Sequence, residues 1–204
     1  MERLIKVGWI IHPAMRARDA CITTLMVAAC LATNYTLVGI PNVKLMDFLV
    51  FASGLLFGLK VGVAVAVLTW AIYGTLNPYG FCLPILLATT ASETIYGLAG
   101  GLLGRHGLLD RLDEDGLAWT AYKLGVLGFS LTALYDLLTN LAFAYAFHMP
   151  LLPTLAFGAY FALVHEASNA LIFAFCTPAL ARLKSLGIPG SHELSARGEQ
   201  GRVG

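Results

Sequence analysis

Residues 39–47 read Gly39-Ile40-Pro41-Asn42-Val43-Lys44-Leu45-Met46-Asp47, a short polar stretch between two apolar runs. The run that follows extends from Phe48 to Gly58. A proline-containing connection between such runs must lie at the water boundary, because an unpaired backbone amide costs several kcal/mol in hydrocarbon. The stretch therefore predicts a hairpin at the membrane surface that acts as a lid or rim. Its amide, ammonium and carboxylate groups favour a role in recognition, with a plain solvated turn as the alternative.

The composition predicts an integral membrane protein. Hydrophobic residues make up 58% of the chain and charged residues 12%, against about 25% charged in a soluble domain. Residues 61–92 contain no charged side chain, and residues 137–164 contain none besides the titratable His148. Both windows exceed the roughly 20 residues that span hydrocarbon. The net charge of +1 argues against a nucleic-acid partner, since it offers no basic patch for phosphate contacts.

Apolar segments along the chain predict an all-α membrane protein, a bundle of six transmembrane helices. The expected helices cover residues 20–38, 45–59, 61–76, 82–103, 117–147 and 152–183. The second and third are short for a full crossing, so a re-entrant pair is the alternative to two spans. Three regions follow: a cytoplasmic or interfacial N-terminal segment at 1–18, a six-helix substrate-binding domain at 19–184, and a disordered cytoplasmic tail at 185–204.

Basic residues are distributed unevenly between the two sides of the expected bundle. One side holds Arg3, Lys6, Arg16, Arg18, Lys60, Arg105, Arg111, Arg182 and Lys184, and the other holds Lys44. By the positive-inside rule, we expect both termini in the cytoplasm. The hairpin at 39–44 and the turns at 77–80 and 148–150 would then face outward over one mouth.

Glycines recur at four-residue steps in the second, third and fourth expected helices. The series are Gly54, Gly58 and Gly62, then Gly97 with Gly101, and Gly100 with Gly104. Small residues at this spacing permit the backbones of neighbouring helices to approach closely. We therefore expect tight packing between these helices.

Three acids are expected at membrane depth, where each ionisable group is a candidate functional residue. Glu93, Asp136 and Glu166 lie at similar distances from the outward ends of the fourth, fifth and sixth expected helices. With neighbouring polar residues they outline a cavity between these helices. No Lys or Arg is expected at that depth, so protonation, or a cationic or donor-rich ligand, would have to relieve the charge. The alternative to a binding site is that these polar groups only form hydrogen bonds between helices and have a purely structural role.

The candidate substrate-binding residues share this depth or belong to the hairpin above it. They are Asn42, Glu93, Tyr96, Asp136, Asn140, His165, Glu166 and Asn169. The run from His165 to Asn169 resembles the HExxH zinc motif but lacks its second histidine, and the cysteines show no CxxC spacing. We therefore expect no metal, no cofactor and no enzymatic activity. An intramembrane enzyme that uses His165 and Glu166 as acid and base is the alternative.

In combination, several segments resemble the substrate-binding S components of energy-coupling factor (ECF) vitamin transporters. The likeness extends over roughly residues 20–183. The residues that carry it are Ala28 and Ala32 of an AxxxA pattern, the hairpin at 40–44, the stretch at 53–58, and residues 70–78 with Trp70, Asn77 and Pro78. The hairpin, together with the glycine-containing stretch after it, is the most specific part.

The resemblance implies a subunit of an ABC importer in the cytoplasmic membrane of a prokaryotic cell. Such a subunit crosses the lipid bilayer several times and binds a small water-soluble vitamin or related micronutrient outside the cell. Pro41, Asn42 and Lys44 would belong to its lid. Ala28 and Ala32 would dock onto a transmembrane T component, which works with two cytoplasmic ATPases. The alternative function is a proton- or cation-coupled secondary transporter or channel that uses the buried acids as a relay.

Overall fold

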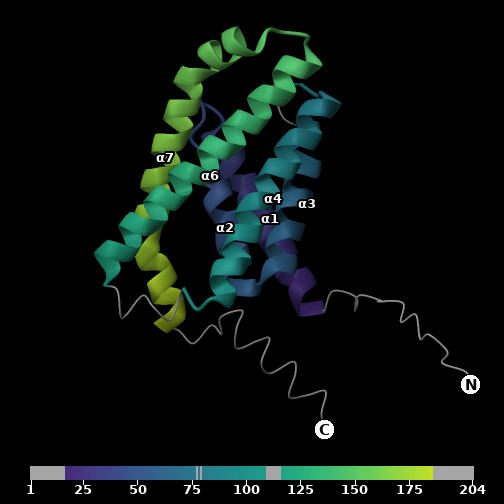
Figure 1. Ribbon diagram of the computed structural model, residues 1–204. Helices are drawn as coiled ribbons and strands as arrows, with labels where there is room; N and C mark the ends of the chain where they lie inside the picture. The colour runs from purple at the N-terminus through teal and green to yellow at the C-terminus, as the bar shows by residue number, and fades with distance from the viewer. Residues whose placement is uncertain (1–16, 77, 79, 109–115, 186–204) are drawn as a thin grey trace, which may run out of the picture.

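The computed structural model describes residues 17–76, 78, 80–108 and 116–185, and within them the chain is all helical, with no strand (Figure 1). The helices are α1 (Ala17–Leu37), α2 (Met46–Phe57), α3 (Leu59–Leu76), α4 (Leu83–Arg105), α6 (Leu117–Ala146) and α7 (Leu151–Ser185). All the expected helices are found, with ends that differ by a few residues. The expected N-terminal segment and tail lie outside the described residues, except that α1 already begins at Ala17 and α7 extends to Ser185.

Four of these helices are long and apolar enough to cross a membrane, namely α1, α3, α6 and α7. In contrast, α2 has only 12 residues. That length corresponds to about 18 Å of helix, which falls short of the roughly 30 Å hydrocarbon layer. Nearly every residue of α2 is buried, so it is a core helix enclosed by its neighbours.

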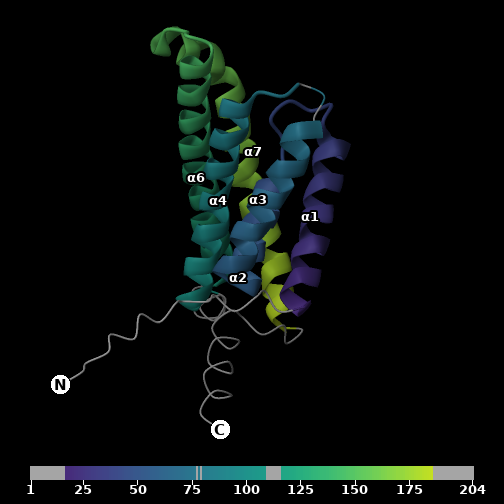
Figure 2. The ribbon, with the colours of Figure 1, turned by 90° about the vertical axis from the view of Figure 1, so that its right-hand side faces the viewer.

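The helices run up and down, so their connections gather at two ends of the molecule (Figures 1 and 2). The start of α1 and the end of α7 lie at the lower end, while the α1–α2 hairpin and the α6–α7 turn lie at the upper end. The most extensive contacts join α6 with α7, and α4 with both α2 and α3. Helix α2 also touches α7. The residues of its first turn, Met46, Asp47 and Phe48, are buried, so this turn faces the interior of the bundle.

Aromatic rings fill the space between α2 and α7. Phe173 of α7 is fully buried, and its ring centroid lies 5.2 Å from that of Phe48 and 5.1 Å from that of Phe51. Between helices in lipid such rings stabilise the contact by packing, and an aromatic pair contributes about 0.5 to 1.5 kcal/mol beyond area burial. This contact fixes α7 against the core helix and thereby sets the position of the polar residues one to two turns earlier on α7.

Glycines allow α2, α3 and α4 to touch through their backbones, as the four-residue spacing predicted. A Cβ added at Gly62 of α3 would lie 2.7 Å from the Cα of Gly54, and a Cβ added at Gly97 of α4 would lie 2.6 Å from the carbonyl oxygen of Gly62. Both distances are too short for a side chain, and the atoms in the way belong to the backbone. The expectation of tight packing is confirmed at these positions.

We expect Gly62→Ala to destabilise the protein by at least about 1 kcal/mol, because the helices must move apart to accept the methyl group. Thermal unfolding in detergent, followed by the loss of helical circular dichroism, measures the effect. Gly39→Ala is the matched control, since nothing lies within 4 Å of a Cβ at Gly39. Equal unfolding midpoints for the two variants would mean that α2, α3 and α4 are packed less tightly than described.

Candidate functional site

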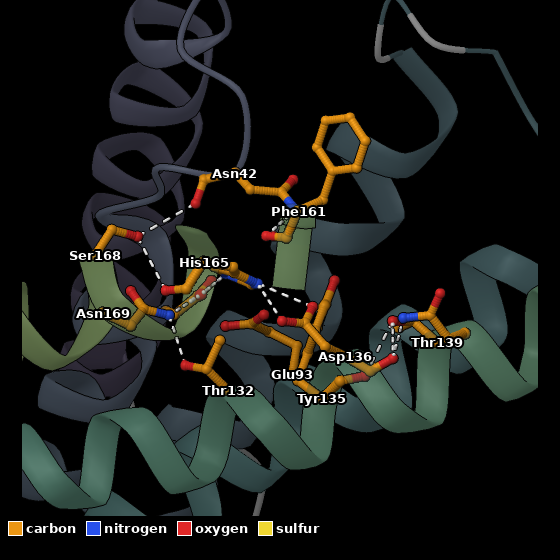
Figure 3. A network of polar contacts seen from close by, with 12 residues as sticks. Asn42, Glu93, Thr132, Tyr135, Asp136, Thr139, Phe161, His165, Ser168 and Asn169 are labelled. Atoms are coloured by element: carbon orange, nitrogen blue, oxygen red, sulfur yellow. Dashed lines mark hydrogen bonds and ion pairs between the residues drawn. The ribbon is translucent and has the colours of Figure 1, made fainter. Parts of the chain in front are cut away.

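A buried histidine joins two carboxylates from different helices (Figure 3). His165 of α7 is 1% exposed. Its Nε2 atom lies 2.8 Å from Oδ2 of Asp47 on α2, and its Nδ1 atom lies 3.0 Å from Oδ1 of Asp136 on α6. We call these three residues the carboxylate–imidazole cluster. Both contacts are hydrogen bonds when an imidazolium lies between two carboxylates, or when a neutral imidazole donates to one carboxylate and accepts from the protonated form of the other.

Neutral polar groups extend the carboxylate–imidazole cluster to α4. The Nδ2 atom of Asn169 donates to Oδ2 of Asp47 at 2.6 Å and to Oγ1 of Thr132 at 2.8 Å. The Tyr96 hydroxyl also donates to Oγ1 of Thr132, at 2.9 Å, while Thr132 donates to the carbonyl of Gly128. Thr132 therefore uses its donor and both of its lone pairs. The network ties together α2, α4, α6 and α7 through buried contacts.

Asp47 is the functional residue that sequence reasoning missed. It belongs to the polar stretch at 39–47, but the sequence does not predict it as a binding residue. The structure places it in the first turn of α2, fully buried and bound by His165 and Asn169. A signal was present, since an acid that opens a run of uninterrupted apolar residues must be enclosed together with that run.

Lys44 of the hairpin points inward onto two aromatic rings. Its Nζ atom lies 5.7 Å from the ring centroid of Trp70 and 5.3 Å from that of Tyr135. The Tyr135 ring in turn lies edge-on to His165, with 5.6 Å between the ring centroids. The expectation that no Lys or Arg lies near the buried acids is therefore wrong, because the Lys44 ammonium of the hairpin reaches the same region.

Glu93 forms a separate contact from the carboxylate–imidazole cluster. It is fully buried on α4, and its Oε2 atom accepts a hydrogen bond from the Trp70 indole at 3.2 Å. This contact joins α3 to α4 through Trp70, one of the two rings that contact Lys44. Glu93 therefore lies close to the other acids but shares none of their hydrogen bonds (Figure 3).

Two other candidate residues lie outside the network. The Nδ2 atom of Asn140 donates to the backbone carbonyl of Asp136 on its own helix, and its Oδ1 atom lies 2.6 Å from the position that a Cβ at Gly158 of α7 would take. Glu166 is half-buried and has no hydrogen bond to any residue that the structure describes. Asn140 therefore spaces α6 from α7, and Glu166 does not join the other acids.

The hairpin packs on α7 above His165, as Figure 3 shows. The Asn42 side chain donates to the carbonyl oxygen of Phe161 at 2.9 Å, and the Ser168 hydroxyl donates to the carbonyl oxygen of Asn42 at 3.3 Å. The two α7 partners lie about one turn before and after His165. Asn42 itself has φ of 53°, a left-handed conformation that asparagine tolerates better than most residues.

Two cavities meet beneath the hairpin, with volumes of about 280 Å³ and 380 Å³. Asn42, Lys44 and Tyr73 line both of them. The larger cavity is completed by Trp70, Gly74, Gly80, Cys82, Ile85, Leu86, Thr89, Phe143 and Phe147. Its walls are α3, α4 and the end of α6, whereas the sequence predicted a cavity between α4, α6 and α7. Its size is within the range of small-molecule pockets.

Comparison with known proteins assigns no family to the chain. No protein-family model matches it, and no curated protein or solved structure matches it to a significant degree. The residues themselves define a helical protein with membrane-length helices, a buried carboxylate–imidazole cluster and a cavity beneath an anchored hairpin.

Proposed function

We propose that the chain is the substrate-binding S component of an ECF-type importer. In this role it is a multi-pass protein of a prokaryotic cytoplasmic membrane, with both termini in the cytoplasm. It captures a small water-soluble vitamin or related micronutrient from outside the cell. The observation that carries the proposal is the cavity of about 380 Å³ beneath a hairpin that is hydrogen-bonded to α7.

The hairpin acts as the lid in this proposal. Among the described residues, two hydrogen bonds hold Asn42 against α7: its side chain donates to the Phe161 carbonyl, and the Ser168 hydroxyl donates to the Asn42 carbonyl. Each such bond contributes about 0.5 to 1.5 kcal/mol, which is small enough for the hairpin to open and close readily. Opening would admit the solute to the cavity, and closing would separate it from water.

The importer proposal is tested by identifying the solute and its energy source. The protein is purified from cells grown in rich medium, and any co-purifying small molecule is identified by mass spectrometry. Uptake of that molecule is then measured in cells with intact and with catalytically inactive ATPase subunits. Uptake that needs both this chain and ATP hydrolysis supports the proposal, whereas uptake that continues without ATP hydrolysis contradicts it.

A docking face is expected on α1. Ala28 and Ala32 are exposed there and do not line either cavity. We expect Ala28→Leu or Ala32→Leu to reduce pull-down of the T component by about tenfold while ligand affinity stays unchanged, because a bulky side chain prevents close helix contact. Ala156→Leu, at an exposed alanine of α7, is the control. An equal loss of docking and ligand binding would argue against a separate docking face.

The carboxylate–imidazole cluster favours a second candidate function, a proton- or cation-coupled secondary transporter. Alternating acid and base groups across α2, α7 and α6 form the type of relay that carries protons in transporters. In liposomes, such a protein would show pH-dependent ion flux that Asp136→Asn abolishes. Solute uptake that depends on an ion gradient instead of ATP would select this function over the importer.

A further inference from the structure

The Lys44 ammonium lies where the two cavities meet, and it lines both of them. The faces of Trp70 and Tyr135 hold it in place, at 5.7 Å and 5.3 Å from the ring centroids. These contacts fix the direction of the side chain, but a ring face cannot fully replace the water around an ammonium with three donors. Among the described residues, Lys44 has no ion pair within 4.0 Å, and its ammonium donates no hydrogen bond.

The charge along both cavity walls is positive. Of the described residues that line the two cavities, Lys44 is the one charged side chain. Asp47 and Glu93 lie near the ammonium but line neither cavity, and their hydrogen bonds come from other groups: Asp47 accepts from His165 and Asn169, and Glu93 accepts from Trp70. An anionic group in the cavity would therefore meet an ammonium before it met a carboxylate.

The rest of the larger cavity is apolar and aromatic. Tyr73, Leu86, Phe143 and Phe147 supply walls for a flat or compact hydrophobic body. Thr89 lines the same wall, and its hydroxyl donates to backbone carbonyls of its own helix, which leaves an oxygen that can accept a hydrogen bond. One charged donor beside apolar walls is the usual form of a site that orients an amphiphilic small molecule.

We propose that the cavity binds a small organic anion, with its carboxylate on the Lys44 ammonium and its apolar body against the aromatic wall. This inference rests on the proposed solute-binding function and names the charge class of the solute. It differs from the expectation of a cationic or donor-rich ligand in the sign of the charge. A cation at the same rings would have to displace Lys44 or lie beside it, and like charges placed together cost several kcal/mol.

The test compares three probes of the same shape and different charge: 4-methylbenzoate, neutral 4-methylbenzamide and cationic 4-methylbenzylammonium. Trp9→Phe and Trp119→Phe leave Trp70 as the single tryptophan, so that quenching of its fluorescence reports binding beside Lys44. We expect the benzoate to bind about tenfold or more tightly than the amide, since a charge-assisted hydrogen bond contributes about 1.5 to 3 kcal/mol. The ammonium probe should bind most weakly.

Lysine variants then assign the preference to Lys44. Lys44→Met should remove the difference between the acid and the amide, while Lys44→Arg should retain it. Lys123→Met is the matched control, because the Lys123 Nζ atom lies 5.4 Å from the Trp119 ring centroid on α6 and lines neither cavity. Thermal unfolding of each variant checks that it remains folded.

The outcomes separate this inference from the importer proposal. Tightest binding by the ammonium probe, an acid preference that survives Lys44→Met, or no binding of any probe at millimolar concentration would each overturn the anion site. ATP-dependent uptake and T-component pull-down do not use these probes, so the importer proposal stands or fails on its own measurements.

Discussion

His165→Leu should lower the free energy of unfolding by about 3 to 5 kcal/mol, because it leaves two buried carboxylates without the group that lies between them. The imidazole lies 2.8 Å from Asp47 and 3.0 Å from Asp136, and the side chains of His165 and Asp47 are each 1% exposed. Leucine has a similar volume, so lost packing contributes less than the lost hydrogen bonds. Equilibrium unfolding in mixed micelles measures the change.

Two further variants show whether buried charge causes the loss of stability. Adding Asp47→Asn and Asp136→Asn to His165→Leu should recover part of the stability, since neutral amides cost less to bury than ionised carboxylates. His106→Leu, at an exposed histidine that follows α4, should have almost no effect. A His165→Leu protein as stable as its parent would mean that water reaches the carboxylate–imidazole cluster.

The helices could be predicted from the sequence because each apolar run is bounded by charge, glycine or proline. Whether α2 spans the membrane or is buried among the other helices was harder to predict. A run of apolar residues after Asp47 suits a short membrane span as well as a core helix, and only contact with α4 and α7 decides between them. The glycine series predicted part of this packing, since Gly54, Gly62 and Gly97 meet at the α2–α3–α4 interface.

The site was predicted in part, for reasons that follow from distance along the chain. His165 and Asn169 lie four positions apart on one face of α7, and Asp136 lies on α6, the helix before it. Helical spacing and the order of the helices were therefore enough to predict these three residues as neighbours. Asp47 pairs with His165 across 118 positions, and no local pattern reports such a contact. The inward direction of Lys44 likewise depends on Trp70 and Tyr135, which come from two other helices.

Asn42→Ala should increase the rate at which the co-purifying solute dissociates by roughly thirtyfold, while the association rate changes little. The alanine loses the hydrogen bond to the Phe161 carbonyl, which contributes about 0.5 to 1.5 kcal/mol. It must also hold the left-handed conformation at φ of 53°, which costs an ordinary residue about 1 to 2 kcal/mol. Together these effects destabilise the closed hairpin by about 2 kcal/mol, and each 1.4 kcal/mol is a factor of ten in rate.

Asn42→Gly separates the two contributions, because glycine adopts the left-handed conformation freely but has no amide to donate. We expect it to accelerate dissociation less than Asn42→Ala does, by the factor that the hydrogen bond alone supplies. Ser168→Ala removes the second contact, the hydroxyl that donates to the Asn42 carbonyl, and should act in the same direction as Asn42→Gly. Chase of bound radiolabelled solute with excess unlabelled solute measures all three rates. If dissociation is as slow from Asn42→Ala as from the parent, the solute leaves by a path that does not open the hairpin, and the hairpin is then a fixed wall of the cavity instead of its lid.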